Sequence, residues 1–296
     1  MVYYQRMILS LGTPQLGVPS GYGVNNGHGG LTDAEAKALL DAARRTGFTM
    51  LDTSSEYGLA EQRIGAYLRK HPDAFQVNGK YNAQYPRERI EELKQRTLER
   101  TGRLDHVMYY CVDVDVAHLD PAGADGISVY SVDEARAVDG KPYQYIQVPG
   151  SILDGRMDAE IKRQQSMGRK VLVRSILLQG LLAMDPTGTL AGNVGNGSFI
   201  SSARPHLAGL KAIGDDNRMT VIEMAVRWAW HLNPDASIFG AESPEQVEAI
   251  GDFIHRGELP RAIRDAVLEL RVDIPELVIS PRMWGQQYDF TSSAVG

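Results

Sequence analysis

Eight short apolar segments, separated by longer polar stretches, constrain the fold of this chain more than any other feature. Their near-continuous apolar character is typical of parallel strands buried on both faces. Strands that alternate with helical patterns predict a parallel sheet, and eight is the number that closes a (β/α)8 barrel, the TIM barrel. A doubly wound open sheet is the alternative architecture. The eight segments are 8–13, 49–53, 75–79, 106–113, 126–129, 145–149, 170–175 and 237–240.

Helix-start signals lie between several of these segments. Thr32 with Glu35 forms a capping-box pattern, and Gly47 is a suitable end for the helix that follows. Further starts are predicted at Ser131, Thr220 and Ser243, the last followed by proline at the first helical position.

We expect a single barrel domain over residues 1–296. The link from Val114 to Asp125 is too short and too rich in proline and glycine for a full helix, so the fourth crossover is predicted to be shortened. Residues 273–296 are polar and aromatic, and we expect this tail to lie over the barrel mouth; a plain surface tail is the alternative.

Composition excludes several classes of function. The net charge of −6 and a pI near 5.7 argue against a basic nucleic-acid-binding face. The single cysteine, Cys111, excludes an internal disulfide framework, and no cluster has metal-ligand spacing, so no metal is predicted. Residues 1–12 lack the apolar core of a signal peptide, and the longest apolar stretch, 171–184, is too short to span a bilayer. We therefore predict a cytoplasmic protein that binds neither nucleic acid nor membranes.

The segment 51–58, LDTSSEYG, ends one predicted strand and turns toward a helix that starts near Ala60. Lys80 follows the next predicted strand. Since the carboxyl ends of barrel strands face the active site, we expect Asp52, Tyr57 and Lys80 to converge there. A cation lowers the pKa of a neighbouring tyrosine from about 10 by roughly 1–3 units. The pattern therefore predicts that Tyr57 gives a proton to a carbonyl oxygen while Asp52 holds Lys80.

These residues belong to a series of motifs that resembles the aldo-keto reductases along nearly the whole chain, in order. The general look is closest to bacterial reductases encoded with surface-sugar pathways. The motifs are LGTPQLG at 11–17, DTSSEYG at 52–58, EQRIG at 61–65, GIS at 126–128, Gln147, SILLQGLL at 175–182 and GAESPEQ at 240–246.

The resemblance implies a nicotinamide dinucleotide bound without a Rossmann domain. Asp52, Tyr57 and Lys80 match the catalytic positions, and Arg174 matches the residue that packs on the nicotinamide ring. Ser128 and Gln147 match the residues that bind the carboxamide. The remaining matches are Ser175, Leu177 and Gly180 at the pyrophosphate, and Gly240, Glu242, Ser243 and Gln246 toward the adenosine end.

Two positions depart from the family pattern. The family completes its catalytic set with a histidine that ends the fourth strand, and here that position is Asp113, or Val112 if the register slips by one residue. Glu242 stands where a basic residue often meets the 2′-phosphate of NADP, and a carboxylate there opposes that phosphate. We therefore expect NAD(H) or NADP(H) as cofactor, without strong selectivity for NADP.

Three functions remain open from the sequence. The leading hypothesis is an oxidoreductase that transfers hydride between nicotinamide and a carbonyl or alcohol of a small polar or sugar-like substrate, with a place in carbohydrate metabolism. Because Asp113 replaces the usual histidine, the same barrel as an epimerase, dehydratase or C=C reductase is one alternative. A non-catalytic binding or regulatory barrel is the other. The expected partner is a small-molecule substrate, and the expected assembly is a monomer or small homo-oligomer.

Overall fold

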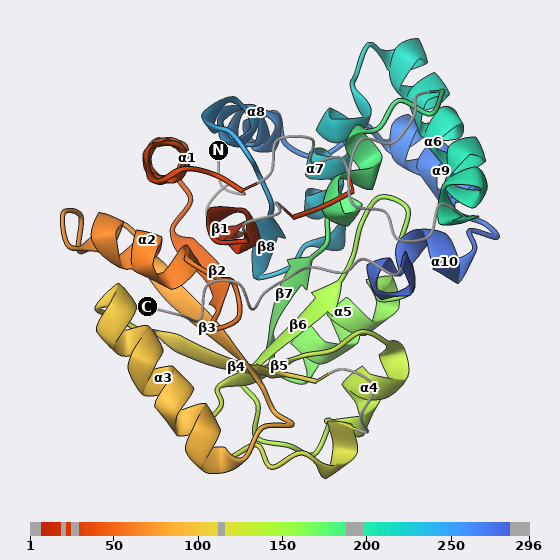
Figure 1. The fold of residues 1–296 in the computed structure, drawn as a ribbon. Helices are drawn as coiled ribbons and strands as arrows, with labels where there is room; N and C mark the ends of the chain where they lie inside the picture. Colours follow the sequence, from red (N-terminus) through yellow and green to blue (C-terminus); the bar gives the residue numbers. More distant parts are fainter. Residues whose placement is uncertain (1–6, 19–21, 25–29, 112–115, 188–197, 285–296) are drawn as a thin grey trace.

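Eight parallel strands pair in chain order and close into a barrel (Figure 1). The computed structural model describes residues 7–18, 22–24, 30–111, 116–187 and 198–284. The closed barrel confirms the predicted TIM-barrel architecture and excludes the open sheet. The strands are β1 (Ile8–Gly12), β2 (Met50–Ser54), β3 (Gln76–Asn82), β4 (His106–Tyr110), β5 (Gly126–Ser128), β6 (Tyr145–Pro149), β7 (Lys170–Arg174) and β8 (Ala236–Phe239).

Helices surround the barrel and cover its outer surface (Figure 1). The α-helices are α1 (Asp33–Arg45), α2 (Ala60–Leu68), α3 (Arg87–Thr101), α4 (Val132–Ala137), α5 (Asp158–Ser166), α6 (Ser198–Asn217), α7 (Val221–Leu232), α8 (Pro244–His255), α9 (Arg261–Leu270) and α10 (Glu276–Ile279). Short 3-10 segments are η1 (Pro14–Leu16), η2 (Val116–His118), η3 (Leu178–Ala183), which is kinked at Gln179 and Gly180, and η4 (Pro281–Trp284).

The predicted helix starts are confirmed by their capping geometry. The Thr32 hydroxyl accepts a hydrogen bond from the Glu35 backbone at 3.3 Å, and the Glu35 carboxylate accepts one from the Thr32 backbone at 2.7 Å. These bonds satisfy backbone donors that the first turn of α1 leaves without helical partners. The side chains of Ser131, Thr220 and Ser243 cap α4, α7 and α8 in the same way.

The sheet register decides which side chains face the barrel interior. Asp52 on β2 pairs with Gly12 on β1 and with Asn78 on β3. Because side chains alternate along a strand, Lys80 points to the same side as Asn78. The prediction that Lys80 follows its strand is wrong, since β3 continues to Asn82. The extra strand residues are paired with β4, which fixes the direction of the Lys80 side chain more firmly than a loop would.

The two unusual segments of the sequence also have defined places. In its described part, the crossover from β4 to β5 contains only the short turn η2, in agreement with the predicted shortening. The start of the C-terminal tail lies against the barrel mouth, where Arg156 binds the Glu276 carboxylate at 3.0 Å and the Ile279 carbonyl at 3.2 Å. Residues 285–296 lie outside the described residues.

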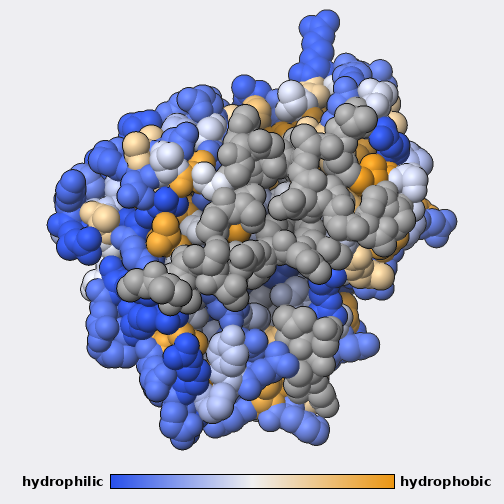
Figure 2. All heavy atoms as spheres, viewed as in Figure 1, coloured by the Kyte–Doolittle hydropathy of each residue, from blue (hydrophilic) through white to orange (hydrophobic). Residues whose placement is uncertain are grey.

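The periphery of the face shown in Figure 2 is mainly hydrophilic, with apolar residues in scattered positions. Among the described residues, no helix has the length and apolar character needed to cross a membrane.

Candidate active site

A cavity of about 1000 Å³ opens at the carboxyl ends of the strands. Its volume suits a ligand larger than a simple aldehyde, because small-molecule sites occupy about 300–1000 Å³. Asp113, the predicted fourth catalytic residue, lies outside the described residues and stays a prediction. Every other predicted site residue lines this one cavity: Asp52, Tyr57, Lys80, Ser128, Gln147, Arg174, Ser175, Leu177, Gly180, Gly240, Glu242, Ser243 and Gln246.

Asp52 and Lys80 form a buried ion pair at the floor of the cavity. The Lys80 ammonium donates to Asp52 Oδ2 at 2.5 Å, and the two residues are 8% and 2% exposed, respectively. Asp52 Oδ1 also accepts hydrogen bonds from Asn78 Nδ2 at 2.8 Å and from Gln147 Nε2 at 2.9 Å. Three donors from two strands therefore hold the carboxylate in one orientation, and the carboxylate in turn fixes the ammonium.

Tyr57 lies beside this ion pair. The Lys80 Nζ atom is 5.3 Å from the centre of the Tyr57 ring. Burial raises the pKa of Tyr57, and it outweighs the charge and hydrogen bond of Lys80, which act to lower it. The predicted net lowering of this pKa is therefore wrong, because the cost of burying a phenolate exceeds what one cation recovers. The phenol keeps its proton at neutral pH and is available as a proton donor.

The ammonium of Lys80 is stabilised by its surroundings. Burial acts to lower the pKa of Lys80, but the charges of Asp52 and then Tyr57, together with hydrogen bonds to both, raise it above the usual value. Lys80 therefore stays cationic throughout the neutral range, and it can support negative charge that develops on the Tyr57 oxygen.

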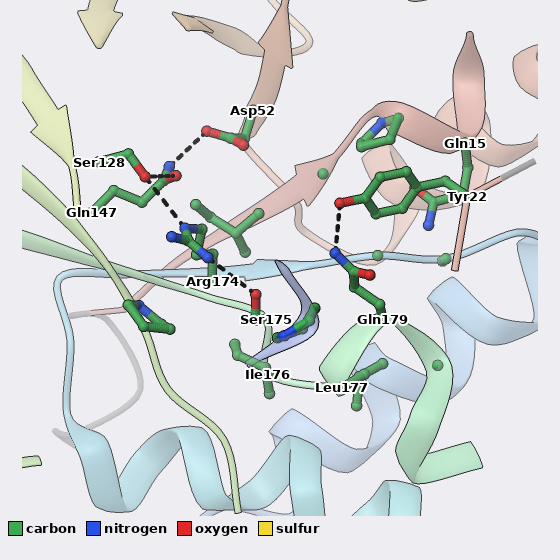
Figure 3. Close-up of a pocket in the computed structure, with 18 of the residues that line it drawn as sticks. Gln15, Tyr22, Asp52, Ser128, Gln147, Arg174, Ser175, Ile176, Leu177 and Gln179 are labelled. Atoms are coloured by element: carbon green, nitrogen blue, oxygen red, sulfur yellow. Dashed lines mark hydrogen bonds between the residues drawn. The ribbon is translucent and has the colours of Figure 1, made fainter. Parts of the chain in front are cut away.

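A chain of hydrogen bonds connects Asp52 with the loop after β7 (Figure 3). Gln147 bridges Asp52 and Ser128, whose hydroxyl donates to Gln147 Oε1 at 3.0 Å. Arg174 continues the chain, since its Nε donates to Ser128 Oγ and its Nη1 to Ser175 Oγ, each at 3.3 Å. The residues that the resemblance assigns to the nicotinamide thus form one continuous polar surface.

The backbone of the loop after β7 has an unusual conformation. Ser175, Leu178 and Gln179 have φ values of 60°, 46° and 50°, in the left-handed backbone region that residues other than glycine rarely adopt. Each such residue costs of order 1 kcal/mol, and such strain is concentrated at ligand-binding loops. Successive backbone N–H groups in turns of this kind form concavities that bind anions, which suits a pyrophosphate.

A second segment reaches this loop from the β1–α1 connection. Gln179 Nε2 donates to the Tyr22 hydroxyl at 2.8 Å, and the Val24 N–H donates to the Gln179 carbonyl at 2.9 Å (Figure 3). Gly23 between them has a φ of +114°, and a Cβ there would lie 2.8 Å from the Gln179 carbonyl oxygen. The close approach therefore requires glycine. This connection was not predicted from the sequence, where the glycine-rich pattern around residue 23 is its only signal.

The far end of the cavity has groups that fit a nucleotide. The Ser243 hydroxyl caps α8, and the Gln246 side chain accepts a hydrogen bond from the Glu242 N–H at 2.9 Å. Gln15 Oε1 and Gln179 Oε1 are buried in the cavity wall and have no hydrogen-bond partner among the described residues. Buried acceptors usually have donors, and ribose hydroxyls or an adenine amino group supply them.

Glu56 and Tyr110 are cavity residues that the sequence analysis did not identify. Tyr110 ends β4 and pairs in register with Ser128 on β5. Its hydroxyl donates to the Glu56 carboxylate. The alternation of β4 was the only signal in the sequence that distinguished Tyr110 from its neighbour Tyr109, which points to the outside of the barrel.

Comparison with known proteins agrees with the architecture and confirms the resemblance predicted from the sequence. The sequence profile of the Aldo/keto reductase family matches residues 9–262. Among curated proteins, none matches the chain.

Solved structures of the same fold are similar over most of their length. The glycerol dehydrogenase AKR11B4 from Gluconobacter oxydans is 19% identical with a TM-score of 0.68, and the match covers 90% of this chain and 93% of that one. The aldo-keto reductase AKR11C1 from Bacillus halodurans, in its holo form, is 20% identical with a TM-score of 0.68, covering 88% and 91%. An aldo/keto reductase from Klebsiella pneumoniae in complex with NADP and acetate is 18% identical with a TM-score of 0.60, covering 89% and 90%.

Proposed function

Because this chain belongs to the aldo/keto reductase family, we propose that it reduces the carbonyl group of a small polar substrate with a nicotinamide cofactor, and that Tyr57 supplies the proton. The observation that carries the proposal is the placement of Tyr57 against the buried Asp52–Lys80 pair, in the wall of one large cavity. A family of oxidoreductases and an intact proton-donating group favour an enzyme over a binding barrel without activity.

The nicotinamide, when bound, supplies hydride to the carbonyl carbon. Negative charge then develops on the carbonyl oxygen, and the Tyr57 hydroxyl gives it a proton. The Tyr57 oxygen gains negative charge as the proton leaves, and the nearby Lys80 ammonium stabilises that charge. Asp52 keeps the ammonium in place, and alcohol oxidation uses the same groups in reverse.

Different parts of the cavity would hold different parts of the cofactor. Ser128, Gln147 and Arg174 are proposed for the nicotinamide end, and the left-handed loop from Ser175 to Gly180 for the pyrophosphate. At the adenosine end, the Glu242 side chain lines the cavity next to the first turn of α8. A carboxylate there favours the free ribose hydroxyls of NAD(H) over a 2′-phosphate. We propose that NADH serves at least as well as NADPH.

Tyr57→Phe tests the proposal. Purified protein is given NADH or NADPH with a panel of short aldehydes and ketones, and oxidation of the cofactor is followed by absorbance. Loss of a positioned general acid lowers turnover by about 10²–10⁴-fold. Cofactor affinity, measured by fluorescence titration, should stay within twofold of the original. Unchanged turnover in Tyr57→Phe would refute the proton-donor role, and failure of the original protein to oxidise either cofactor with every substrate would refute the reductase.

A further inference from the structure

Glu56 receives two phenol hydrogen bonds beside the proton donor. It precedes Tyr57 in the loop between β2 and α2, and its side chain lines the cavity. The Tyr85 hydroxyl donates to Glu56 Oε1 at 2.6 Å, and the Tyr110 hydroxyl donates to Glu56 Oε2. Tyr85 does not line the cavity, whereas Tyr110 does. Glu56 and Tyr110 therefore form the part of this cluster that a substrate meets.

The fold fixes where Tyr110 points. It is the last residue of β4 and is in register with Asn82 on β3 and Ser128 on β5. Ser128 also lines the cavity, so both face the interior. Burial raises the pKa of Tyr110, and the charge and hydrogen bond of Glu56 raise it further. The phenol therefore keeps its proton and directs it toward Glu56.

Counting donors and acceptors shows what this pair offers a substrate. A phenol has one proton to donate and two lone pairs to accept with, and a carboxylate has about four acceptor positions and no proton. The proton of Tyr110 is already used by Glu56. Both groups therefore present only acceptors to the cavity, and they favour a ligand that brings a hydroxyl proton.

Hydrogen-bond donors line the same cavity. The Tyr57 phenol and the Lys80 ammonium keep their protons and are hydrogen-bond donors, which suit a carbonyl oxygen. Glu56 directly precedes Tyr57 in the chain, and the side chains of both residues line the same cavity as Tyr110. A donor group and an acceptor group thus line one cavity, and a molecule with a carbonyl oxygen and a nearby hydroxyl matches both.

We propose that Glu56 and Tyr110 together bind a hydroxyl group close to the reacting carbonyl, so that hydroxyaldehydes and hydroxyketones are the preferred substrates. The proposal rests on the reductase function proposed above and adds its substrate class. The carboxylate also disfavours substrates with an anionic group at that place, because like charges repel strongly where water is excluded.

The test compares two aldehydes of equal chain length on the same enzyme. Values of kcat/KM are measured for glyceraldehyde and for propionaldehyde with saturating cofactor, corrected for the hydrated fraction of each aldehyde. A hydrogen bond to a charged acceptor predicts a preference for glyceraldehyde of about 10- to 100-fold. Because the result is a ratio within one preparation, loss of correctly folded protein does not change it.

Two variants change the two acceptor groups, Glu56 and Tyr110, one at a time. Glu56→Gln keeps the size of the side chain and removes its charge, and Tyr110→Phe removes only the hydroxyl. In each, the preference should fall to about threefold or less, chiefly through a higher KM for glyceraldehyde. Tyr109→Phe is the matched control on the same strand, because the Tyr109 hydroxyl donates to the Ala122 carbonyl on the outer side of the barrel. This control should keep the original ratio.

The outcomes separate the two proposals. Reduction of both aldehydes at similar rates by the original protein overturns the substrate class but leaves the reductase intact. A preference that survives both Glu56→Gln and Tyr110→Phe overturns the role of this pair. Failure to reduce either aldehyde, or any other carbonyl compound, refutes the reductase and the substrate class together.

Discussion

Asp52→Asn removes the charge that compensates Lys80 while hardly changing the size of the side chain. Asp52 accepts hydrogen bonds from Lys80, Asn78 and Gln147, and it is 2% exposed. An asparagine has one acceptor oxygen and an amide NH2 group that only donates, so at least one of these donors would face another donor. The variant therefore leaves a buried ammonium without its counter-ion.

The expected loss of stability is large for a single isosteric change. Breaking a buried ion pair by removing one partner costs about 3–5 kcal/mol of unfolding free energy. For a chain of 296 residues, this corresponds to a fall in Tm of roughly 5–8 °C. Asp215→Asn is the matched control, because the Lys211–Asp215 pair is 52% and 65% exposed and such surface pairs contribute at most about 1 kcal/mol.

The pH dependence of stability shows whether the unpaired Lys80 ammonium causes the loss. In the original protein the pKa of Lys80 is raised, so its contribution to stability is fully present below the unfolded value of about 10.4 and is lost only above it. In Asp52→Asn, burial acts without the opposing charge, and the pKa of Lys80 should fall below the unfolded value. The unfolded chain then binds more protons, and stability should rise with pH between about pH 7 and pH 10.

Urea unfolding of the original protein, Asp52→Asn and Asp215→Asn at about pH 7 and pH 9.5 measures both effects. The loss of unfolding free energy in Asp52→Asn is expected to be smaller at the higher pH. A deficit below about 1 kcal/mol at neutral pH, equal to that of the exposed control, would show that the buried pair does not have the assigned energetic role.

Two further predictions concern catalysis and the cofactor. The pKa of Tyr57 is raised above its usual value of about 10, so the phenol stays protonated. The kcat/KM for reduction should therefore be level from neutral pH to about pH 9.5, while the rate of alcohol oxidation should keep rising. A reduction rate that falls near pH 8 would contradict this assignment. Glu242→Lys should improve NADPH affinity relative to NADH by about tenfold or more in a fluorescence titration. Glu248→Lys is the control, because it makes the same change at a residue of α8 that pairs with Arg45, and it should leave the affinity ratio unchanged. An unchanged ratio in both variants would place Glu242 away from the 2′-phosphate.

Local pattern was sufficient to predict the barrel. The eight strand-forming runs, the capping box at Thr32 and the other predicted helix caps are properties of neighbouring residues, and each is present in the structure. Asp52 and Lys80 were also predictable as neighbours, because adjacent parallel strands bring their carboxyl ends together.

Features that depend on environment were not predictable in this way. The direction of the pKa shift of Tyr57 is decided by burial against the charge of Lys80, and a sequence names the cation but not the degree of burial. Tyr110 was missed because its role depends on strand register, which a shift of one residue would reverse. The bond between Tyr22 and Gln179 joins loops 157 positions apart, and no local pattern contains it.

Isotopic labelling shows whether hydride passes from the cofactor to the substrate inside this cavity. The protein is incubated with a hydroxyaldehyde and with NADH or NADPH that carries deuterium at the transferable position, and the alcohol product is examined by mass spectrometry. One deuterium is expected on the former carbonyl carbon of the alcohol, and Tyr57→Phe is expected to form very little of this labelled alcohol. An alcohol product without deuterium, or no alcohol from any carbonyl substrate although both cofactors bind, would contradict hydride transfer inside this cavity.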